Sequence, residues 1–221
     1  MMFATDPVTT RAERHAMVTS QLRTNAVSDT RVIAAMASIP RELFLPPEAA
    51  GLAYRDTAIP LGAARAANPP LATGRLLTEA ALAPDDRVLL IGAAGGYAAA
   101  VLAGLVAQVV AVESDPRLLA IARRSLADTG NVEVVEAPLE AGHPAGGPYD
   151  VLVVDGAAEE LPALLLDQVR PGGRIVAGLI ERGVTRLAAG RKTAGGFGLQ
   201  AFVDSDCVVL PGFARPQGFR F

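Results

Sequence analysis

The 221-residue sequence has few of the residues that metal centres, disulfide frameworks and nucleic-acid-binding surfaces require. Its one cysteine, Cys207, excludes an internal disulfide and a zinc site built on cysteines. Its two histidines, His15 and His143, are too few for a histidine-rich centre, so we expect no metal. The formal net charge of −3 provides no basic excess for neutralising phosphates, and we expect no nucleic-acid partner.

Long apolar runs are also missing. The most apolar stretch, residues 97–112, is interrupted by Gln108 and is shorter than the roughly 18 residues that a membrane span needs. The first 17 residues lack the apolar core of a secretory signal. Hydrophobic residues make up 51% of the chain and charged residues 19%, as in ordinary globular domains. We therefore expect a cytoplasmic protein without a membrane partner, either a monomer or a homodimer.

The chain is expected to form a single domain, residues 1–221, in three segments of different texture. The first, residues 1–80, mixes charge and proline with helical patterns. Helices are predicted at 10–23 and from the Ser28-Asp29 cap through Ser38, with irregular chain between Pro46-Pro47 and Pro69-Pro70. The second, residues 81–180, alternates apolar strands with helices. The third, residues 181–221, carries strand patterns without helices between them.

The alternation predicts an α/β fold with a mostly parallel sheet and helices on both faces. The expected strands are 87–91, 108–113, 132–135, 150–154 and 174–177, and the expected helices are 97–105, 116–127 and about 161–169. Further strands at 185–189, 199–203 and 207–210 are expected to add an antiparallel C-terminal edge, with Cys207 on it as a small apolar residue. The aromatic rings of Phe213, Phe219 and Phe221 are expected to close over the core, and His143 to lie in a surface loop.

The loop after the first predicted strand reads Gly92-Ala93-Ala94-Gly95-Gly96 and is followed by Tyr97. Ala94 stands where the dinucleotide motif needs its second glycine, and no P-loop lysine follows. Glu113 ends the next strand 21 residues after Gly92, where a carboxylate can accept both hydroxyls of a ribose. The spacing favours an adenosine-type cofactor. The alternative stays open that the glycines only permit close packing and that Glu113 only ends a strand.

Several segments, in order, match a known pattern. They are Met17-Val18 with Gln21-Leu22, Val32–Met36, Ile39-Pro40-Arg41-Glu42 with Phe44, Ala53-Tyr54 with Asp56, Ile59-Pro60-Leu61-Gly62, Asp86–Leu89, Ile91-Gly92, Gly96-Tyr97 with residues 99–103, Tyr149–Val151, Ala157-Ala158, Pro162, and Gln168 with Gly172-Gly173-Arg174. Over roughly residues 16–180 the chain resembles the protein-L-isoaspartate O-methyltransferase family. The resemblance implies a Rossmann-like class I methyltransferase fold, S-adenosylmethionine as cofactor, and methyl transfer to the carboxylate of damaged aspartyl residues in proteins or peptides, which is a protein-repair activity. It implies cofactor contacts from Gly92, Ala93, Ala94, Gly95, Gly96, Tyr97 and Glu113.

The stretch after Gly62 departs from that family. The family's sequence there is approximately Gly-Gln-Thr-Ile-Ser-Gln-Pro, with two hydroxyls beside the substrate carboxylate and the transferred methyl. This chain has Ala64-Arg65-Ala66-Ala67-Asn68-Pro69-Pro70 instead. Leu90 replaces an acid two residues before the loop glycine, and Ala137-Pro138-Leu139 replaces a Gly-Asp-Gly that contacts adenine. Ala137 and Pro138 stay candidate cofactor contacts, and the loss of polar groups predicts weaker cofactor binding.

Three side chains are candidates for the catalytic side of the site. The amide of Asn68 could replace a lost hydroxyl donor, and Arg65 could pair with a substrate carboxylate bidentately. Both could equally be exposed loop residues. Asp155 is expected near the methyl, where an acid would repel a carboxylate and suit an amine or hydroxyl acceptor. We favour the simpler interpretation that Asp155 is a turn residue capping the next helix.

The sequence therefore predicts an S-adenosylmethionine-dependent methyltransferase of the isoaspartyl type. A carboxylate nucleophile is already ionised near neutral pH, so the absence of a nearby histidine does not argue against this activity. Two alternatives stay open. One is a methyltransferase with a different acceptor, including an unknown small molecule. The other is a non-catalytic homologue acting as a binding or regulatory module, because Leu90 and Pro138 replace polar contacts with apolar groups.

Overall fold

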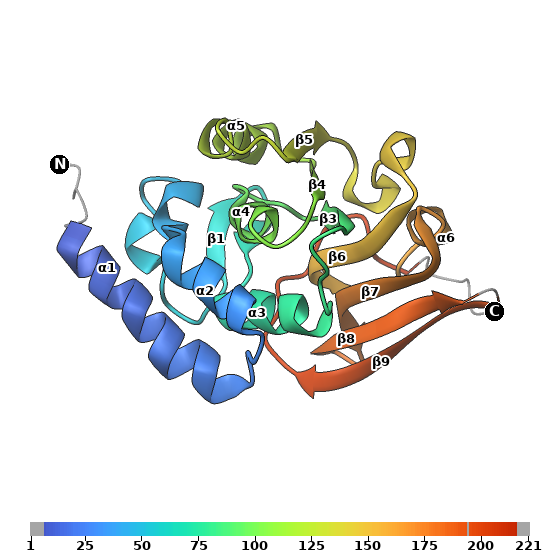
Figure 1. Cartoon of the computed structure of the whole chain (residues 1–221), viewed down its shortest axis with the longest axis horizontal. Coiled ribbons are helices and arrows are strands. Elements are labelled where there is room, and N and C mark those ends of the chain that lie inside the picture. Colours follow the sequence, from blue (N-terminus) through green and yellow to red (C-terminus); the bar gives the residue numbers. More distant parts are fainter. Residues whose placement is uncertain (1–6, 194, 216–221) are drawn as a thin grey trace, which may run out of the picture.

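The computed structural model describes residues 7–193 and 195–215. Its centre is a seven-stranded sheet in the order β5-β4-β3-β6-β7-β8-β9 (Figure 1). The strands are β3 (Arg87–Ile91), β4 (Gln108–Glu113), β5 (Val132–Glu136), β6 (Tyr149–Ala158), β7 (Val169–Glu181), β8 (Val184–Thr193) and β9 (Gly196–Asp204). Neighbours from β5 through β7 pair in parallel, whereas β8 pairs antiparallel with both β7 and β9. The predicted mostly parallel sheet with an antiparallel C-terminal edge is confirmed.

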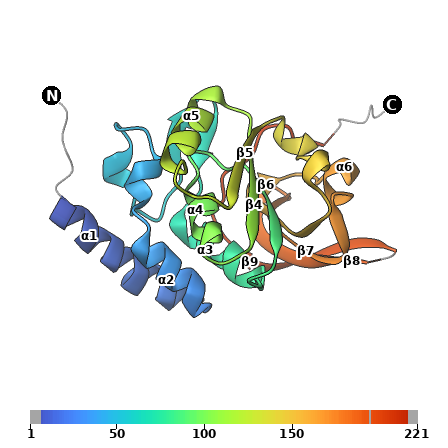
Figure 2. The same cartoon turned by 45° about the horizontal axis from the view of Figure 1, so that its top comes forward.

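The two faces of the sheet bury alternate residues of each strand, as the period of a strand requires. On β3, Val88 and Leu90 pack into one cluster, together with helices α2 (Thr30–Ser38), α3 (Pro70–Glu79), α4 (Tyr97–Ala103) and α5 (Pro116–Ser125). Leu89 and Ile91 face the other side, where the four-residue helix α6 (Ala163–Leu166) and the C-terminal segment cover them. Figure 2 shows α1 and α2 at the opposite end of the molecule from α6, in agreement with Figure 1.

The N-terminal segment has more regular structure than the sequence predicts. The expected first helix is present as α1 (Pro7–Ala16), continued by a π-helical turn over residues 17–22 and a 3₁₀ turn over residues 23–25. Asp29 caps α2, and its side chain accepts a hydrogen bond from the Arg31 N–H. The chain between Pro46-Pro47 and Pro69-Pro70, which was expected to be irregular, ends at the predicted point but contains the paired strands β1 (Ile59–Gly62) and β2 (Arg65–Ala67). Pro70 begins α3, because proline is favoured where the first helical N–H has no partner.

A short hairpin precedes α3, and the sequence analysis did not predict it. Strands β1 (Ile59–Gly62) and β2 (Arg65–Ala67) pair antiparallel. Gly62, Ala63 and Ala64 all have left-handed φ values, of 82°, 47° and 57°. The left-handed region is costly for alanine because its Cβ approaches the following carbonyl oxygen. The hairpin thus turns through two strained residues directly before Arg65.

The expected strand at 207–210 is not part of the C-terminal edge. This segment returns to the carboxyl end of β6, where the Ala157 N–H donates to the Val208 carbonyl at 2.6 Å and the Leu210 N–H to the Ala157 carbonyl at 2.9 Å. Cys207 therefore lies beside the centre of the sheet rather than on an edge strand. The predicted burial of Phe213 is confirmed, whereas Phe219 and Phe221 lie outside the described residues.

No helix in the described ranges is long and apolar enough to cross a membrane. Within residues 7–193 and 195–215, no three histidine, cysteine, aspartate or glutamate side chains cluster as they would to hold a metal ion.

Candidate functional site

The candidate site lies at the carboxyl ends of β3, β4 and β6, where the loop Gly92–Gly96 joins β3 to α4. The N–H groups of Gly92 and Ala93 both donate to the Val112 carbonyl at 3.1 Å, which ties the loop to β4. Gly96 directly precedes α4 as its N-cap and has a φ of 99°, a conformation that glycine adopts without strain. A Cβ on Gly95 would lie 1.9 Å from the Phe44 carbonyl oxygen. The loop is therefore in direct backbone contact with the segment after α2.

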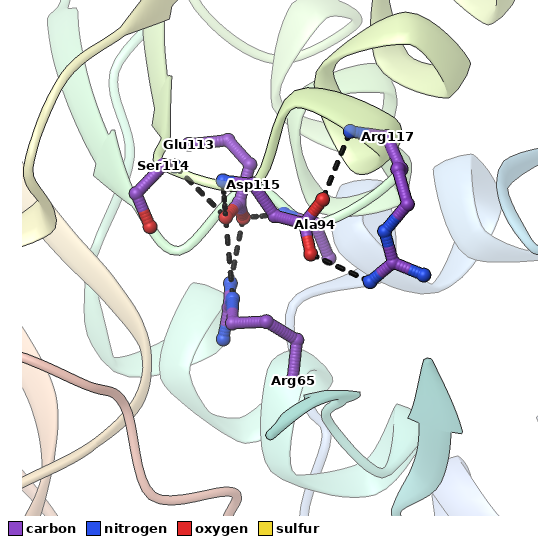
Figure 3. Close-up of polar contacts among 6 residues, drawn as sticks. All are labelled: Arg65, Ala94, Glu113, Ser114, Asp115 and Arg117. Atoms are coloured by element: carbon purple, nitrogen blue, oxygen red, sulfur yellow. Dashed lines mark hydrogen bonds and ion pairs between the residues drawn. The ribbon is translucent and has the colours of Figure 1, made fainter. Parts of the chain in front are cut away.

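Glu113 is fully buried at the end of β4, beside that loop. Its carboxylate accepts three backbone N–H groups, from Ala94 at 2.7 Å, Ser114 at 2.9 Å and Asp115 at 3.0 Å. Arg65 adds two more bonds, from Nε to Oε1 at 3.2 Å and from Nη2 to Oε2 at 2.6 Å (Figure 3). Glu113 therefore does more than end a strand, because its carboxylate accepts hydrogen bonds from five N–H donors in three parts of the chain.

Arg65 comes from β2 and is not an exposed loop residue. Its side chain is 3% exposed, and its planar fork meets the two oxygens of Glu113 in a bidentate pair. The same side chain was expected to pair with a substrate carboxylate, but in the structure it pairs with the residue predicted to hold the ribose. Its Nη1 has no hydrogen-bond partner among the described residues.

Asn68 and Asp155 are hydrogen-bonded to each other beside the loop. The Asn68 Nδ2 donates to Asp155 Oδ1 at 2.9 Å, and its Oδ1 accepts the Val208 N–H at 3.0 Å. The Thr73 hydroxyl also donates to Asp155 Oδ1, at 2.8 Å. The alternative that Asn68 is exposed is wrong, since the residue is only 4% exposed. Asp155 is not a turn residue either, because β6 continues through it to Ala158 with a register shift between Val154 and Ala157.

Burial raises the pKa of Asp155, against the opposing effects of the Asn68 and Thr73 hydrogen bonds. The nearest strong positive charge that the sequence analysis did not single out is Arg41. Its guanidinium lies 4.8 Å from the centre of the Tyr97 ring, and its Nη2 donates to the Asn68 carbonyl at 2.6 Å. Arg41 is 2% exposed, and its Nε has no partner among the described residues. Its position in the segment Ile39-Pro40-Arg41-Glu42, used above only for resemblance, was the available signal.

These polar groups and the loop surround a small cavity. Its volume is about 20 Å³, and its lining includes Arg41, Asn68, Tyr97, Asp155 and the loop itself. Two larger cavities lie at the end of β4. One of about 490 Å³ is lined by Ser114, residues 136–140 and Pro211-Gly212, which places Ala137 and Pro138 together. The other, of about 480 Å³, lies between Arg65, Ser114 and Arg117.

The types of residue present, and their positions, fit a nucleoside cofactor. A buried carboxylate and a glycine loop lie at the carboxyl ends of adjacent parallel strands, with open space next to them at the end of β5. The described conformation is closed, however. A volume of about 20 Å³ above the loop holds roughly one water molecule, whereas cofactor pockets usually measure about 300 to 1,000 Å³. Both oxygens of Glu113 are also engaged by Arg65.

This sheet order, with an acid ending the strand next to the glycine loop, defines the class as a Rossmann-like α/β protein of the class I methyltransferase type. The family model described as "Protein-L-isoaspartate(D-aspartate) O-methyltransferase (PCMT)" matches residues 12–204, and the chain belongs to this family. A protein-L-isoaspartate O-methyltransferase of Methanoculleus marisnigri is 41% identical over 169 residues, which cover 76% of this chain and 77% of that protein. One of Methanoregula boonei is 41% identical over 174 residues, covering 78% and 80% of the two chains.

Solved structures show the same fold. A protein-L-isoaspartate O-methyltransferase aligns with a TM-score of 0.76 at 24% identity, covering 91% of this chain and 66% of that one. A Plasmodium falciparum protein, described as a β-aspartate methyltransferase in complex with S-adenosyl-L-homocysteine, aligns with a TM-score of 0.73 at 17% identity, covering 91% and 97%. The predicted family, fold class and methyl donor are confirmed.

Proposed function

We propose that this chain transfers a methyl group from S-adenosylmethionine to the free carboxylate of isoaspartyl residues in proteins or peptides. The observation that carries the proposal is the match of residues 12–204 to a family of carboxyl methyltransferases, with the candidate site inside the matched region. When bound, the cofactor would supply a methyl group on a sulfonium sulfur, and a carboxylate oxygen of the acceptor would bond to that methyl in line as the methyl–sulfur bond breaks and a neutral thioether leaves. The protein's part is to position the two reactants and to exclude water.

The cofactor side of the site would be formed by Glu113 and the Gly92–Gly96 loop. Glu113 would hold the ribose hydroxyls, since a buried, fully desolvated carboxylate is a strong acceptor for them. The Ala94 N–H fixes one oxygen of that carboxylate in place. The cavity beside Ala137 and Pro138 would take the base, mainly through backbone and apolar contacts.

The acceptor side would be formed around the small cavity by Arg41, Asn68 and Asp155. A carboxylate brought next to an ionised Asp155 would be repelled, so it needs a compensating positive charge. The Arg41 guanidinium lines the same cavity, and its Nε is unpartnered among the described residues. We assign Arg41 to the recognition of the acceptor carboxylate and Asn68 to holding Asp155 in position.

The test is methyl transfer to a peptide containing one isoaspartate, with the same peptide containing ordinary aspartate as control. We expect methyl ester formation with the isoaspartyl peptide only, and a large loss of transfer on Glu113→Gln because a neutral amide accepts hydroxyls more weakly. Binding of S-adenosylhomocysteine by calorimetry separates the two halves of the proposal. Binding without transfer to isoaspartate would reject the substrate. No binding at millimolar concentration would reject the enzyme.

One observation favours an amine or a hydroxyl, rather than a carboxylate, as the methyl acceptor. Asp155 presents a half-buried carboxylate to the cavity in which the methyl is expected, and a carboxylate there can accept the proton of an amine or hydroxyl nucleophile, whereas it would repel a carboxylate acceptor. If the acceptor is an amine or a hydroxyl, Asp155→Asn weakens transfer. If the acceptor is a carboxylate, the same change removes a repulsion and does not weaken it. Transfer assays on wild type and Asp155→Asn, with cofactor saturating, distinguish these outcomes.

A further inference from the structure

The Arg65–Glu113 ion pair has the burial and the bidentate geometry of a stable structural contact. Both side chains are almost fully buried, at 3% and 0% exposure, and the guanidinium meets the carboxylate through two roughly parallel bonds. An ion pair in such a dry environment is screened little by salt or water. The pair joins the β1–β2 hairpin to the end of β4, two elements that are separate in the sequence (Figure 3).

The pair also saturates Glu113. A carboxylate offers about four lone-pair sites, and this one already binds five N–H donors. Three of those donors are backbone groups that cannot leave without unfolding the end of β4 or the glycine loop. The other two belong to Arg65. Any hydroxyl that reaches Glu113 must therefore replace the Arg65 guanidinium.

Backbone strain next to Arg65 and a cavity beside its side chain both favour movement of Arg65. It directly follows Ala63 and Ala64, whose left-handed backbone is strained for alanine. Its Nη1 is buried without a partner in the described residues. The cavity of about 480 Å³ adjoins the side chain, next to Asp115. A small change of the hairpin turn would relieve strain and would release the guanidinium toward this space.

We infer that Arg65 competes with the cofactor ribose for Glu113, so that Arg65 sets the cofactor affinity of this chain. The inference rests on the proposed function, because it takes the ligand to be an S-adenosyl nucleoside. Two states exchange. In one, Arg65 pairs with Glu113 and the site is closed; in the other, the hairpin has moved and the carboxylate is free. The apparent dissociation constant then equals the intrinsic constant divided by the fraction of open molecules.

The experiment measures S-adenosylhomocysteine binding by titration calorimetry to wild type, Arg65→Gln and Arg65→Lys. Glutamine is the residue at the corresponding place in the family stretch quoted above. Arg31→Gln is the matched control, because Arg31 forms a partly exposed pair with Asp29 far from Glu113 in the sequence and on another element. We expect Arg65→Gln to bind ~10-fold tighter or more, as follows if about nine in ten molecules are closed. Arg65→Lys should lie in between, since lysine lacks the planar fork.

Hydrogen exchange of the hairpin amides gives a readout that does not depend on affinity. In wild type, the ligand should accelerate exchange at β1 and β2, whereas in Arg65→Gln exchange should be fast already. Equal or weaker binding by Arg65→Gln and Arg65→Lys, with wild type binding measurably, overturns the inference and leaves the proposed function intact. No binding by any variant overturns both. Binding that appears only when Arg65 is replaced supports both.

Discussion

The buried pair makes an asymmetric prediction for stability without ligand. Arg65→Gln leaves the Glu113 carboxylate with its three backbone N–H donors, so the loss should be that of charged hydrogen bonds, about 2 kcal/mol. Glu113→Gln leaves the Arg65 guanidinium buried with no counter-charge at its Nε and Nη2, which should cost about 4 kcal/mol. Arg117 forms its ion pair with Asp115 from a side chain that is 59% exposed, so solvent screens the pair and Arg117→Gln, with a much smaller expected loss, is the control.

Urea unfolding at neutral pH, followed by circular dichroism, measures these differences as shifts of the urea midpoint. Thermal unfolding followed by the same signal measures them as shifts of the melting temperature. For a chain of this size, about 1 kcal/mol lowers the melting temperature by roughly 2 to 4 °C. Arg65→Gln should therefore melt about 4 to 8 °C below wild type, and Glu113→Gln about 8 to 16 °C below. The double variant should lose less than the sum of the two single losses. If Glu113→Gln loses no more than Arg65→Gln, or if both match Arg117→Gln, the reasoning is refuted.

Three further predictions concern groups around the loop. Burial raises the pKa of Asp155 in the folded protein above its unfolded value of 3.8. As the pH rises above 3.8, the free energy of unfolding of wild type should therefore fall relative to that of Asp155→Asn. Urea titrations at several pH values measure this difference. Tyr97→Phe should leave stability unchanged or raise it by up to about 1 kcal/mol in urea unfolding, because the buried hydroxyl has no partner in the described structure. Gly95→Ala should cost about 1 to 3 kcal/mol, because the added methyl would overlap the Phe44 carbonyl, while Gly51→Ala meets nothing within 4 Å and should be near neutral in the same urea assay.

Each of these can fail in a definite way. A stability difference between wild type and Asp155→Asn that stays constant with pH would mean that the folded pKa is not raised. A loss of more than about 1 kcal/mol in Tyr97→Phe would mean that the hydroxyl has a hydrogen-bond partner after all. Equal effects of Gly95→Ala and Gly51→Ala would mean that the loop does not contact the Phe44 backbone closely.

The sheet could be predicted because its signals are local. Strands β3 and β4 have the predicted bounds, since each is a short run of buried apolar residues between clear breaks. The antiparallel edge followed from strand patterns without intervening helices. Strands β6 and β7 are longer than predicted, because β6 continues past Val154 across a register irregularity that apolar periodicity does not reveal.

The site could be predicted only in part, because its contacts are between residues far apart in the sequence. The loop and Glu113 followed from their spacing. The pairing of Arg65 with Glu113 did not, since it depends on a hairpin turn of three left-handed residues, two of them alanine, which no turn rule favours. Arg41 was missed for a similar reason: its segment Ile39-Pro40-Arg41-Glu42 marked it only through the family resemblance, and its burial depends on contacts with residues far away in the sequence, such as Asn68.

The contact between Asn68 and the Val208 N–H has a consequence for biosynthesis. The two residues are 140 positions apart, and the hydrogen bond joins the start of α3 to one of the last described segments. At about 5 to 20 residues per second, a ribosome needs roughly 7 to 28 s to add that length of chain. During this time Asn68 lacks that partner and the cover over the second face of the sheet is missing. The nascent chain therefore exposes apolar strands until the segment around Val208 has been made, and this interval is when it is most open to aggregation and most dependent on chaperones.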